Sequence, residues 1–337
     1  MKLAIIVLNW NGADDALECI ESLAQQTLKP LIIVVDNNSS DDSVARFKEY
    51  KKTHSSVDCV IIENDKNLGF AGGINTGLTY AREHEYEYIG VLNPDAIADK
   101  NWCRALVNEL STHSYCGIAT GIMQRRNSKT LDTTGDIYTT WGLPGPRNRD
   151  EPVANAPTAA GEIFGATGGG ALYRAAIFND IDMFDEDFFM YYEDVDLSFR
   201  AQLAGWKVRF TPKAIAYHKV GASSKKVPGL AVYNTFKNLP SVFIKNVPRQ
   251  LFWYIGIRFF LTYWLIFASA IRHGNGWPAF KGILASIIRK PAAYKKRWSI
   301  QKNRKASIDY IRSVIHDGLL PNQTGLIKFR KFFTGKY

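Results

Sequence analysis

The chain contains few cysteines, and they form no recognisable motif. Its 337 residues include four cysteines that lie far apart without a C-x-x-C pair, which argues against a zinc ribbon or a disulfide framework. A reducing compartment is the simplest setting for such a chain. The apolar run near its start, residues 3–8, is too short for the core of a signal peptide and instead predicts a first β-strand.

Two common nucleotide-binding motifs are also missing. No stretch fits the phosphate loop G-x-x-x-x-G-K-[ST], and the glycines at positions 69, 72, 73 and 77 do not fit G-x-G-x-x-G. These absences disfavour a P-loop NTPase and a nicotinamide-type Rossmann site. Glycines at a helix start still allow the backbone to approach a phosphate or a sugar closely.

Acidic residues are scarce in the C-terminal third of the chain. From Lys237 to Tyr337 there are 19 lysines and arginines but only two acids, a local charge of +17, whereas the first 236 residues carry a charge of −7. This asymmetry predicts an acidic globular part followed by a basic region that meets an anionic partner. We expect a membrane surface and no nucleic acid, because no nucleic-acid-binding module is recognisable and the basic region is interleaved with an apolar helix.

The rest of the sequence alternates short apolar runs with amphipathic segments. Apolar runs predict buried strands at residues 3–8, 31–35, 59–62, 89–92, 116–121, 208–211 and 214–217, and helices are expected near residues 14–25, 101–110 and 193–204. Strands that alternate with helices through short loops are typical of an α/β fold with a parallel sheet. Residues 123–160 show little periodicity and predict a long excursion that covers a site or holds part of a substrate. Small residues at 165–171 fit either a close approach of the backbone to a ligand or tight packing of a strand on a helix.

Three groups of side chains carry candidate chemistry. Pro94 cannot donate to a sheet ladder, so Asp95 projects from the carboxyl end of a predicted strand, the edge at which open α/β sheets bind ligands. Glu193 and Asp194 begin a predicted helix whose dipole favours their anions, and an anionic carboxylate can take a proton from a hydroxyl. His218 ends a later strand and suits a second ligand of a cation. A plain turn, an acidic first helical turn and a structural histidine are the alternatives.

Seven short motifs follow one another along the chain: I-V-L-N-W-N, V-V-D-N-N-S, N-L-G-F-A-G-G-I-N, N-P-D-A, G-G-G-A-L-Y-R, E-D-V-D-L-S-F-R and H-K-V-G-A-S. Together they resemble family 2 glycosyltransferases, and among these the bacterial rhamnosyltransferases of polysaccharide and O-antigen assembly. The resemblance covers about residues 1–245. It implies an α/β fold of the GT-A type, with a Rossmann-like, mixed and mainly parallel sheet flanked by helices.

The resemblance also implies a role for each matching residue. Asp194 would be the catalytic base, with Glu193 beside it. Asp95 and His218 would hold Mg²⁺ or Mn²⁺ on the donor diphosphate, although Asn93 stands where the family usually has an aspartate. Asp36 would bind the pyrimidine base, within a nucleotide-sugar pocket formed by Asn9, Asp36, Asn38, Asn67, Gly69, Gly72, Asn75 and Asn93. The pocket for the acceptor or the sugar would include Gly169 and Gly170.

The reaction implied is an inverting, metal-assisted transfer of a sugar to a lipid-linked or cell-envelope glycan. The donor that the resemblance favours is dTDP-rhamnose, while a UDP-sugar such as UDP-hexose or UDP-galactofuranose stays open. An alternative of another class is a non-catalytic subunit that binds a nucleotide sugar or a glycan. A nucleotidyltransferase is disfavoured, because its Gly- and Arg-rich first loop is missing after Leu8.

An apolar, aromatic stretch of 21 residues follows, from Leu251 to Ile271. It is long enough to cross a membrane, but basic residues on both sides give no preferred direction of crossing. We expect helices that lie in the membrane interface, with packing on the catalytic domain or in a homodimer as the alternative. The expected domains are therefore a GT-A catalytic domain, 1–245, and a basic helical region, 246–337. The expected location is cytoplasmic, peripheral on the inner face of the cytoplasmic membrane.

Overall fold

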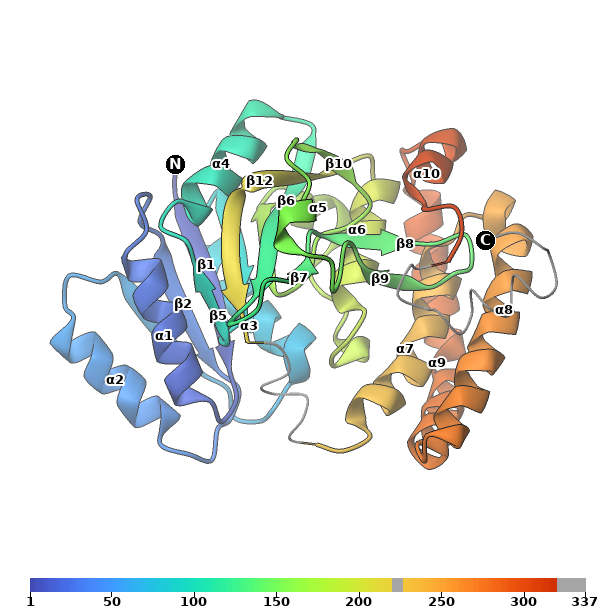
Figure 1. The fold of residues 1–337 in the computed structure, drawn as a ribbon, viewed down its shortest axis with the longest axis horizontal. Helices are drawn as coiled ribbons and strands as arrows, with labels where there is room; N and C mark the ends of the chain where they lie inside the picture. Colours follow the sequence, from blue (N-terminus) through green and yellow to red (C-terminus); the bar gives the residue numbers. More distant parts are fainter. Residues whose placement is uncertain (220–226, 320–337) are drawn as a thin grey trace.

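The computed structural model describes residues 1–219 and 227–319 (Figure 1). Residues 220–223 of the H-K-V-G-A-S motif and residues 320–337 of the predicted helical region lie outside this part. The strands are β1 (Leu3–Asn9), β2 (Leu31–Asp36), β3 (Cys59–Glu63), β4 (Tyr88–Leu92), β5 (Ala96–Ala98), β6 (Cys116–Arg125), β7 (Leu131–Thr133), β8 (Asp136–Tyr138), β9 (Pro144–Pro146), β10 (Gly161–Ile163), β11 (Gly170–Arg174) and β12 (Lys207–His218). The helices are α1 (Ala13–Ala24), α2 (Ser43–Thr53), α3 (Gly69–Glu83), α4 (Trp102–Thr112), α5 (Ile177–Ile181), α6 (Glu193–Leu203), α7 (Leu230–Asn246), α8 (Arg249–Arg272), α9 (Gly276–Lys302) and α10 (Ile308–Val314), with 3-10 turns η1 (Val153–Asn155) and η2 (Glu186–Phe188).

The central sheet is mixed and confirms the expected α/β fold. Its order is β10-β12-β6-β11-β4-β1-β2-β3, with β5 paired to β12 and β7 to β6. Strands β4, β1, β2 and β3 are mutually parallel, whereas β11 runs antiparallel between β4 and β6. The parallel strands therefore end at one edge, which collects Asn9, Asp36 and the Asn93–Asp95 turn.

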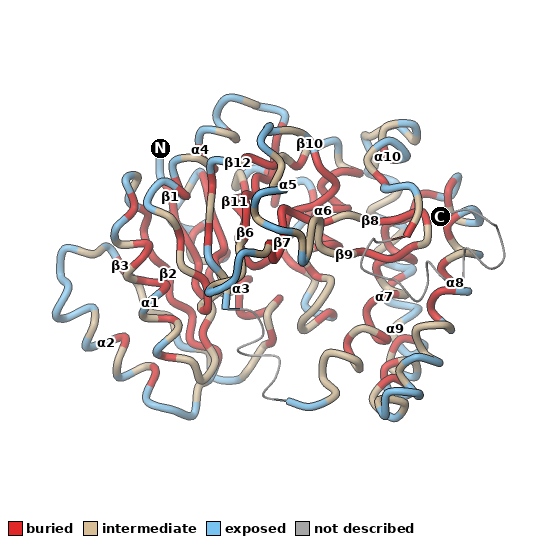
Figure 2. Tube along the Cα trace, viewed as in Figure 1, coloured by how far each residue is buried: buried red, intermediate tan, exposed pale blue. Residues whose placement is uncertain are grey.

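The strands are apolar throughout because helices cover both faces of the sheet. Alternate residues of β1 enter different clusters: Ile5 and Val7 pack with α1 and α4, whereas Ala4 and Ile6 pack with α3. Figure 2 shows the strands as buried and the outer side of α2 as exposed. Burial of both faces fixes the positions of the strand ends that form the site.

The last strand of the sheet, β12, differs from the prediction. Two strands were expected, at 208–211 and 214–217, but residues 207–218, which include Pro212, form the single strand β12. The register shifts between Phe210 and Ile215, and this irregularity accommodates a proline that cannot donate to the ladder. Because the strand continues, His218 pairs with Ala96 of β5 and lies beside Asp95.

The predicted excursion, residues 123–160, is more regular than its sequence indicates. Strand β6 extends to Arg125, β7 pairs with β6, and β8 and β9 form a two-stranded sheet of their own. The Asp136 amide donates to the Gly165 carbonyl, and the Gly165 amide donates to the Asp136 carbonyl. This segment therefore lies against the residues that precede the Gly168–Gly170 run. The excursion therefore contributes side chains to the site edge.

The C-terminal helices share one apolar core with the sheet domain. Phe199 of α6 clusters with Phe236 of α7 and Ile255 of α8. Buried ion pairs add to this contact: Lys245 of α7 lies 2.5 Å from Asp185 and 2.7 Å from Asp196 of α6. Helices α7, α8 and α9 thus form a layer at one end of the molecule, with α2 at the other end (Figure 1).

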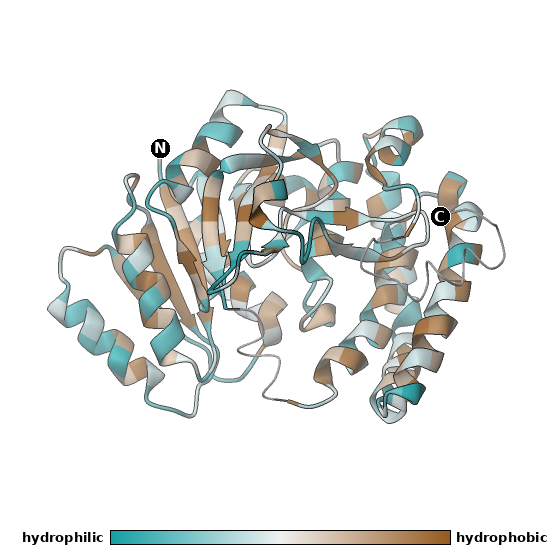
Figure 3. Ribbon diagram, in the orientation of Figure 1, coloured by the Kyte–Doolittle hydropathy of each residue, from teal (hydrophilic) through white to brown (hydrophobic). Residues whose placement is uncertain are grey.

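Helix α8 contains the apolar stretch noted in the sequence. In the part of the chain that the structure describes, it is the one helix long and apolar enough to cross a membrane, by length and composition alone, and only 28% of its most apolar window is buried. Leu251, Ile255 and Phe259 face the protein. Exposed large hydrophobic residues lie on its other side: Trp253, Ile257, Phe260, Leu261 and Trp264. Figure 3 shows brown, hydrophobic stretches along the ribbon of α8.

Candidate active site

The polar residues at the ends of β1 and β2 form a hydrogen-bonded group. Asn9 donates through Nδ2 to Asp36 Oδ1 at 2.9 Å and to Ser39 Oγ at 3.1 Å, and Asp36 Oδ2 accepts from the Ser39 amide at 2.8 Å. These bonds fix the orientation of the Asn9 amide and leave its Oδ1, fully buried, without a partner among the described residues. A buried acceptor of this kind can take a hydrogen bond from a ligand or from a water molecule. Asn38 is exposed beside the group, with φ of 62°.

A second group joins β2 to the start of α3. Asn37 donates to Asn67 Oδ1 and to the Gly69 carbonyl, both at 3.0 Å, and accepts from the Leu68 amide. Gly69 has φ of +71°, and a Cβ there would lie 2.4 Å from the carbonyl oxygen of Phe189. Only glycine allows this approach, so Gly69 places the α3 start against the segment that precedes α6.

Two other predicted pocket residues of α3, Gly72 and Asn75, lie against other parts of the protein. Gly72 lies where a Cβ would come within 2.7 Å of Leu68 Cβ. Asn75 donates to the Phe184 carbonyl at 2.8 Å and to Glu186 Oε1 at 3.0 Å, and accepts from the Phe184 amide. The amide of Asn75 therefore ties α3 to the segment before η2, and its place in the nucleotide-sugar pocket stays a prediction.

Asp95 and His218 lie together at the same sheet edge. His218 Nε2 is 3.0 Å from Asp95 Oδ1 and 3.3 Å from Asn93 Nδ2, and Nδ1 is 2.7 Å from Asp132 Oδ2. Burial acts to lower the pKa of His218, but hydrogen bonds to Asp132 and Asp95 and their negative charges outweigh it and raise the pKa to about 9. Sequence reasoning missed Asp132, which lies in the aperiodic excursion.

The donor set of Asp95 and His218 fits a divalent cation. A carboxylate and an imidazole suit Mn²⁺, and a carboxylate suits Mg²⁺. Asp132 holds the far nitrogen of the ring, as second-sphere carboxylates do for metal-bound histidines. Among residues 1–219 and 227–319, no three His, Cys, Asp or Glu side chains are grouped so that they could hold a metal ion. The protein would thus supply part of the coordination and leave the rest to diphosphate oxygens and water.

A run of glycines lies between the Asn93–Asp95 turn and Asp194. The Asn93 amide donates to the Gly169 carbonyl at 2.9 Å, and the Gly168 amide donates to Asp194 Oδ2 at 2.8 Å. A Cβ on Gly169 would lie 2.9 Å from Asn93 Nδ2, and one on Gly170 would lie 3.1 Å from Met123 Sδ. The space that this backbone run occupies, beside the side chains of Asn93 and Asp194, therefore admits only glycine or another small residue. Gly168 was not among the predicted site residues.

The two carboxylates at the N-terminus of α6 have different surroundings. Burial raises the pKa of Asp194, and backbone amides of Gly168 and Val195 oppose the rise by stabilising the anion. Burial, together with the charge of Asp194, raises the pKa of Glu193 well above its usual range, and Glu193 Oε2 has no partner in the described part of the chain. These surroundings favour a protonated Glu193 and leave the Asp194 carboxylate as a base.

Asp136 is a further buried carboxyl group that sequence reasoning missed. It is 7% exposed, and its backbone is bonded to that of Gly165. Burial and the charge of Asp194 raise its pKa. Nothing in the sequence marks Asp136, because the excursion around it shows little periodicity.

The segment before α6 has an unusual backbone. Phe189, Tyr191 and Tyr192 have φ of 64°, 69° and 71°, and the Met190 amide closes a tight turn onto the Phe188 carbonyl at 2.7 Å. Bulky residues rarely adopt positive φ, and each instance costs on the order of 1–3 kcal/mol. Strain of this size persists only where surrounding contacts hold it, and it occurs here directly before Glu193 and Asp194.

The sequence is similar to a known protein family and to several characterised enzymes. Residues 4–182 match the family model described as glycosyl transferase family 2. The low-salt glycan biosynthesis hexosyltransferase Agl10 of Haloferax volcanii is 25% identical over 260 residues, 73% of this chain and 78% of the relative. Poly-beta-1,6-N-acetyl-D-glucosamine synthase of Staphylococcus epidermidis is 24% identical over 64% of this chain, which spans 49% of that synthase.

Solved structures share the fold. TarS 1–349 of S. aureus in complex with UDP-GlcNAc has a TM-score of 0.56 at 15% identity and covers 94% of this chain and 93% of its own. The mannosyltransferase PcManGT of Pyrobaculum calidifontis, in complex with GDP-Man and Mn²⁺, has a TM-score of 0.53 at 16% identity and covers 98% and 80%. At these identities the likeness shows the GT-A fold alone.

The charged state of His218 predicts a pH dependence of stability in the metal-free protein. Its pKa is raised from 6.5 to about 9, so the stabilisation is fully present below pH 6.5 and is lost as the pH rises through about 9. We compare the free energy of unfolding of the wild type with that of His218→Gln, both in EDTA. As the pH rises from 6.5 to about 9, the advantage of the wild type should fall by at most about 3 kcal/mol. Denaturant titrations at several pH values measure this difference. A difference that stays constant from pH 6 to pH 9.5 would contradict it.

Proposed function

The chain belongs to glycosyl transferase family 2, and from this we propose that it transfers a sugar from a nucleotide diphosphate to a hydroxyl of a lipid-linked or cell-envelope glycan, with inversion. Membership makes it a glycosyltransferase; the donor, the acceptor and the roles of individual residues are our proposals. The observation that carries them is the position of Asp194. It lies at a helix N-terminus, bonded to Gly168, one short backbone run away from the Asn93–Asp95 turn.

The nucleotide lies, in this proposal, at the ends of β1 and β2. The unpartnered acceptor on Asn9 and the carboxylate of Asp36 suit the N–H of a pyrimidine base. A pyrimidine base agrees with dTDP-rhamnose as donor, the sugar that the motifs favour, and equally with a UDP-sugar. Similar proteins act with hexose or N-acetylglucosamine according to their names, so UDP-hexose and UDP-GlcNAc belong in any donor panel.

Asp194 is the proposed base. Its anion, favoured by two backbone amides and strengthened as a base by burial, takes the proton of the acceptor hydroxyl as the oxygen attacks the anomeric carbon. Glu193 stays protonated beside it because burial and the Asp194 charge oppose its ionisation. The bond to the diphosphate breaks on the opposite face, and alignment of both substrates supplies much of the rate.

Asp95 and His218 are the proposed ligands for Mg²⁺ or Mn²⁺. When bound, the cation neutralises the negative charge that develops on the departing diphosphate. Asp132 holds the His218 ring so that Nε2 faces Asp95. A mannosyltransferase of the same fold was crystallised with Mn²⁺, which supports a divalent ion without choosing between the two.

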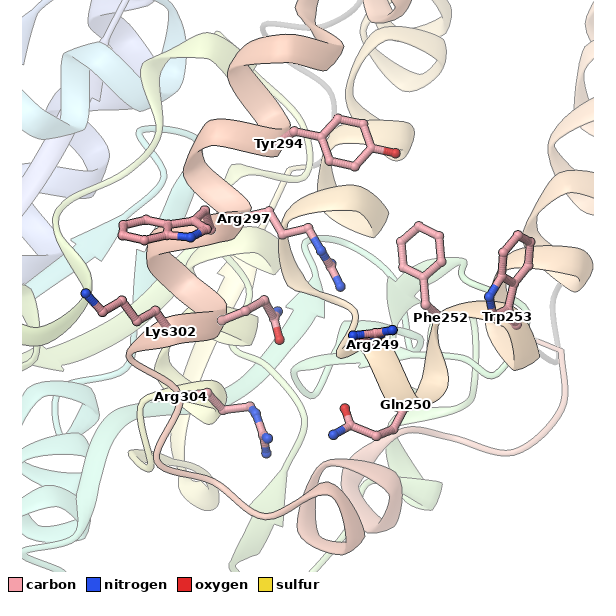
Figure 4. Close-up of a pocket in the computed structure, with 10 residues that line it drawn as sticks. Arg249, Gln250, Phe252, Trp253, Tyr294, Arg297, Lys302 and Arg304 are labelled. Carbon is pink, nitrogen blue, oxygen red and sulfur yellow. The ribbon is translucent and has the colours of Figure 1, made fainter.

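The helical region is proposed to lie on an anionic membrane. Between Arg249 and Ile308 the chain has twelve lysines and arginines and no acid. Helices α8 and α9 border an open hollow of about 710 Å³ that has cationic and aromatic walls and no carboxylate (Figure 4), lined by Arg249, Gln250, Phe252, Trp253, Tyr294, Arg297, Trp298, Gln301, Lys302 and Arg304. Trp253 and Trp298 are 77% and 68% exposed. Exposed indoles beside these lysine and arginine side chains suit lipid headgroups above acyl chains.

These features support a peripheral location on the inner face of the cytoplasmic membrane. We keep the proposed division into a catalytic domain, 1–245, and a membrane-associating region, 246–337. A homodimer through the same helices is the other occupant of this face, and a sizing measurement in the vesicle experiment below separates the two.

Loss of the proposed base should abolish transfer but spare donor binding. With Mg²⁺ or Mn²⁺, a panel of nucleotide sugars and a membrane lipid extract, we expect one donor to release its nucleoside diphosphate. Asp194→Asn should lower that turnover by about 10²–10⁴-fold, the contribution of a positioned base, with donor affinity unchanged. Glu83→Gln, an exposed carboxylate on α3, is the control. Turnover near wild type in Asp194→Asn would dismiss this base, and nucleotide binding without turnover of any donor would favour a binding subunit.

The basic hollow predicts binding to anionic vesicles. We expect sedimentation with vesicles of phosphatidylglycerol and phosphatidylcholine but not with phosphatidylcholine alone. Arg249→Gln with Lys302→Gln should weaken binding by roughly 30-fold, since each cation near an anionic surface contributes about 1 kcal/mol.

The matched control removes two lysines from the opposite end of the molecule. Lys51→Gln with Lys52→Gln, on the exposed side of α2, changes the net charge equally and should leave binding unchanged. Equal weakening by both pairs would reduce the effect to net charge and contradict a specific face. A dimer in solution without vesicle binding would assign the face to a second copy.

A further inference from the structure

Helix α7 holds the strained segment that ends at the proposed base. Asn238 Nδ2 lies 3.0 Å from the carbonyl oxygen of Phe188 and 2.9 Å from those of Met190 and Tyr191. Lys237 Nζ donates to the Phe188 carbonyl at 3.0 Å. We propose that Asn238 is a positioning residue for catalysis: it fixes the backbone of residues 188–192 and thereby the placement of Asp194. This inference rests on the proposed role of Asp194.

The remaining carbonyl of the segment points to the donor side. Phe189 O accepts from the Ala71 amide of α3 at 3.1 Å. All four carbonyls from Phe188 to Tyr191 are therefore held, three by α7 and one by the helix that begins at Gly69. The segment is fixed between the proposed nucleotide-sugar pocket and α7, and Tyr192, its last residue, is the N-cap of α6.

Ion pairs secure the start of the same segment. Asp185 pairs with Lys245 of α7 and Lys296 of α9, both at 2.5 Å. Asp187 pairs with Lys296 at 2.6 Å and with Arg289 at 3.2 Å. The segment is thus bound to α7 and α9 at its start, through Asp185 and Asp187, and to α7 again through the carbonyls near its end. The basic helices complete the active site in addition to any contact with a membrane.

The hydrogen bonds of Asn238 explain how positive φ persists at three aromatic residues. Without the Asn238 amide, the carbonyls of Met190 and Tyr191 would lose these bonds, while the Phe188 carbonyl would keep Lys237 Nζ and the Met190 amide. The segment could then return to negative φ. The Asp194 carboxylate would then leave its position at the N-terminus of α6 against Gly168. Misplacement of a catalytic group by about 1 Å can cost 10²-fold in rate. A purely structural role would instead lower stability and leave the rate of the folded enzyme unchanged.

The same helix offers a matched control. Asn234 lies one turn before Asn238, is 1% exposed, and neither atom of its amide has a hydrogen-bond partner within residues 1–219 and 227–319. Asn238→Ala and Asn234→Ala therefore remove the same buried amide from neighbouring turns, with and without bonds to the segment. Asn238→Ser, which keeps one donor, serves if Asn238→Ala does not fold.

The test measures steady-state kinetics of the full chain with the donor found in the panel. We expect Asn238→Ala to lower kcat by 10–100-fold with the donor KM within 2-fold, Asn238→Ser to fall between it and the wild type, and Asn234→Ala to stay within 2-fold. Combined with Asp194→Asn, Asn238→Ala should cause no further loss of kcat, because both changes remove the same base.

Three results separate the possibilities. A folded Asn238→Ala or Asn238→Ser enzyme with kcat within 2-fold of wild type would overturn the inference. A further 10-fold loss in the combination with Asp194→Asn would also overturn it, because Asn238 would then act independently of the base. Normal turnover of Asp194→Asn alone would instead refute the proposed base, whatever Asn238 does.

Discussion

The short backbone run Gly168–Gly170 is the constraint on which the site depends. The Gly169 carbonyl accepts a hydrogen bond from the Asn93 amide, and the amide of the preceding residue, Gly168, donates to Asp194. Side chains of Asn93 and Asp194 lie so close that a Cβ at Gly168 or Gly169 would come within 3.2 Å or 2.9 Å of them. The proposed metal ligands and the proposed base are therefore held at a fixed separation by a chain segment that cannot carry larger residues.

Much of this arrangement follows from the sequence, because buried parallel strands end at one edge. The apolar runs that end at Asn9, Asp36 and Asn93 predict that these residues lie at one edge of a parallel sheet. Asn9 is in register with Asp36, and β4, which ends directly before Asn93, is parallel to β1. Helix α6 begins at Glu193, as its acidic first turn indicates. The extent of β12 was predicted wrongly: two strands were expected, but the irregularity between Phe210 and Ile215 accommodates Pro212, and His218 reaches Asp95 within one strand.

Other parts of the site carry no local signal. Asp132 and Asp136 lie in an aperiodic segment, and only tertiary pairing of that segment with β6 and Gly165 brings them to the site edge. Positive φ at Phe189, Tyr191 and Tyr192 contradicts the preference of aromatic residues. It is sustained by Asn238, some fifty residues later in the chain. Local propensity cannot anticipate a conformation that distant contacts impose.

The basic helices connect two properties that the sequence presents separately. Their charge and exposed aromatic residues suit an anionic surface, and two of their lysines, Lys245 and Lys296, pair with Asp185, close to the strained residues 188–192 that precede Asp194.

The catalytic role of Asp194 in an in-line displacement is the central claim. The anomeric configuration of the product, determined by NMR on the glycoside formed from the donor of known configuration, tests it most directly. The account predicts an anomeric configuration opposite to that of the donor, and retention would contradict a single base acting from the face opposite the diphosphate.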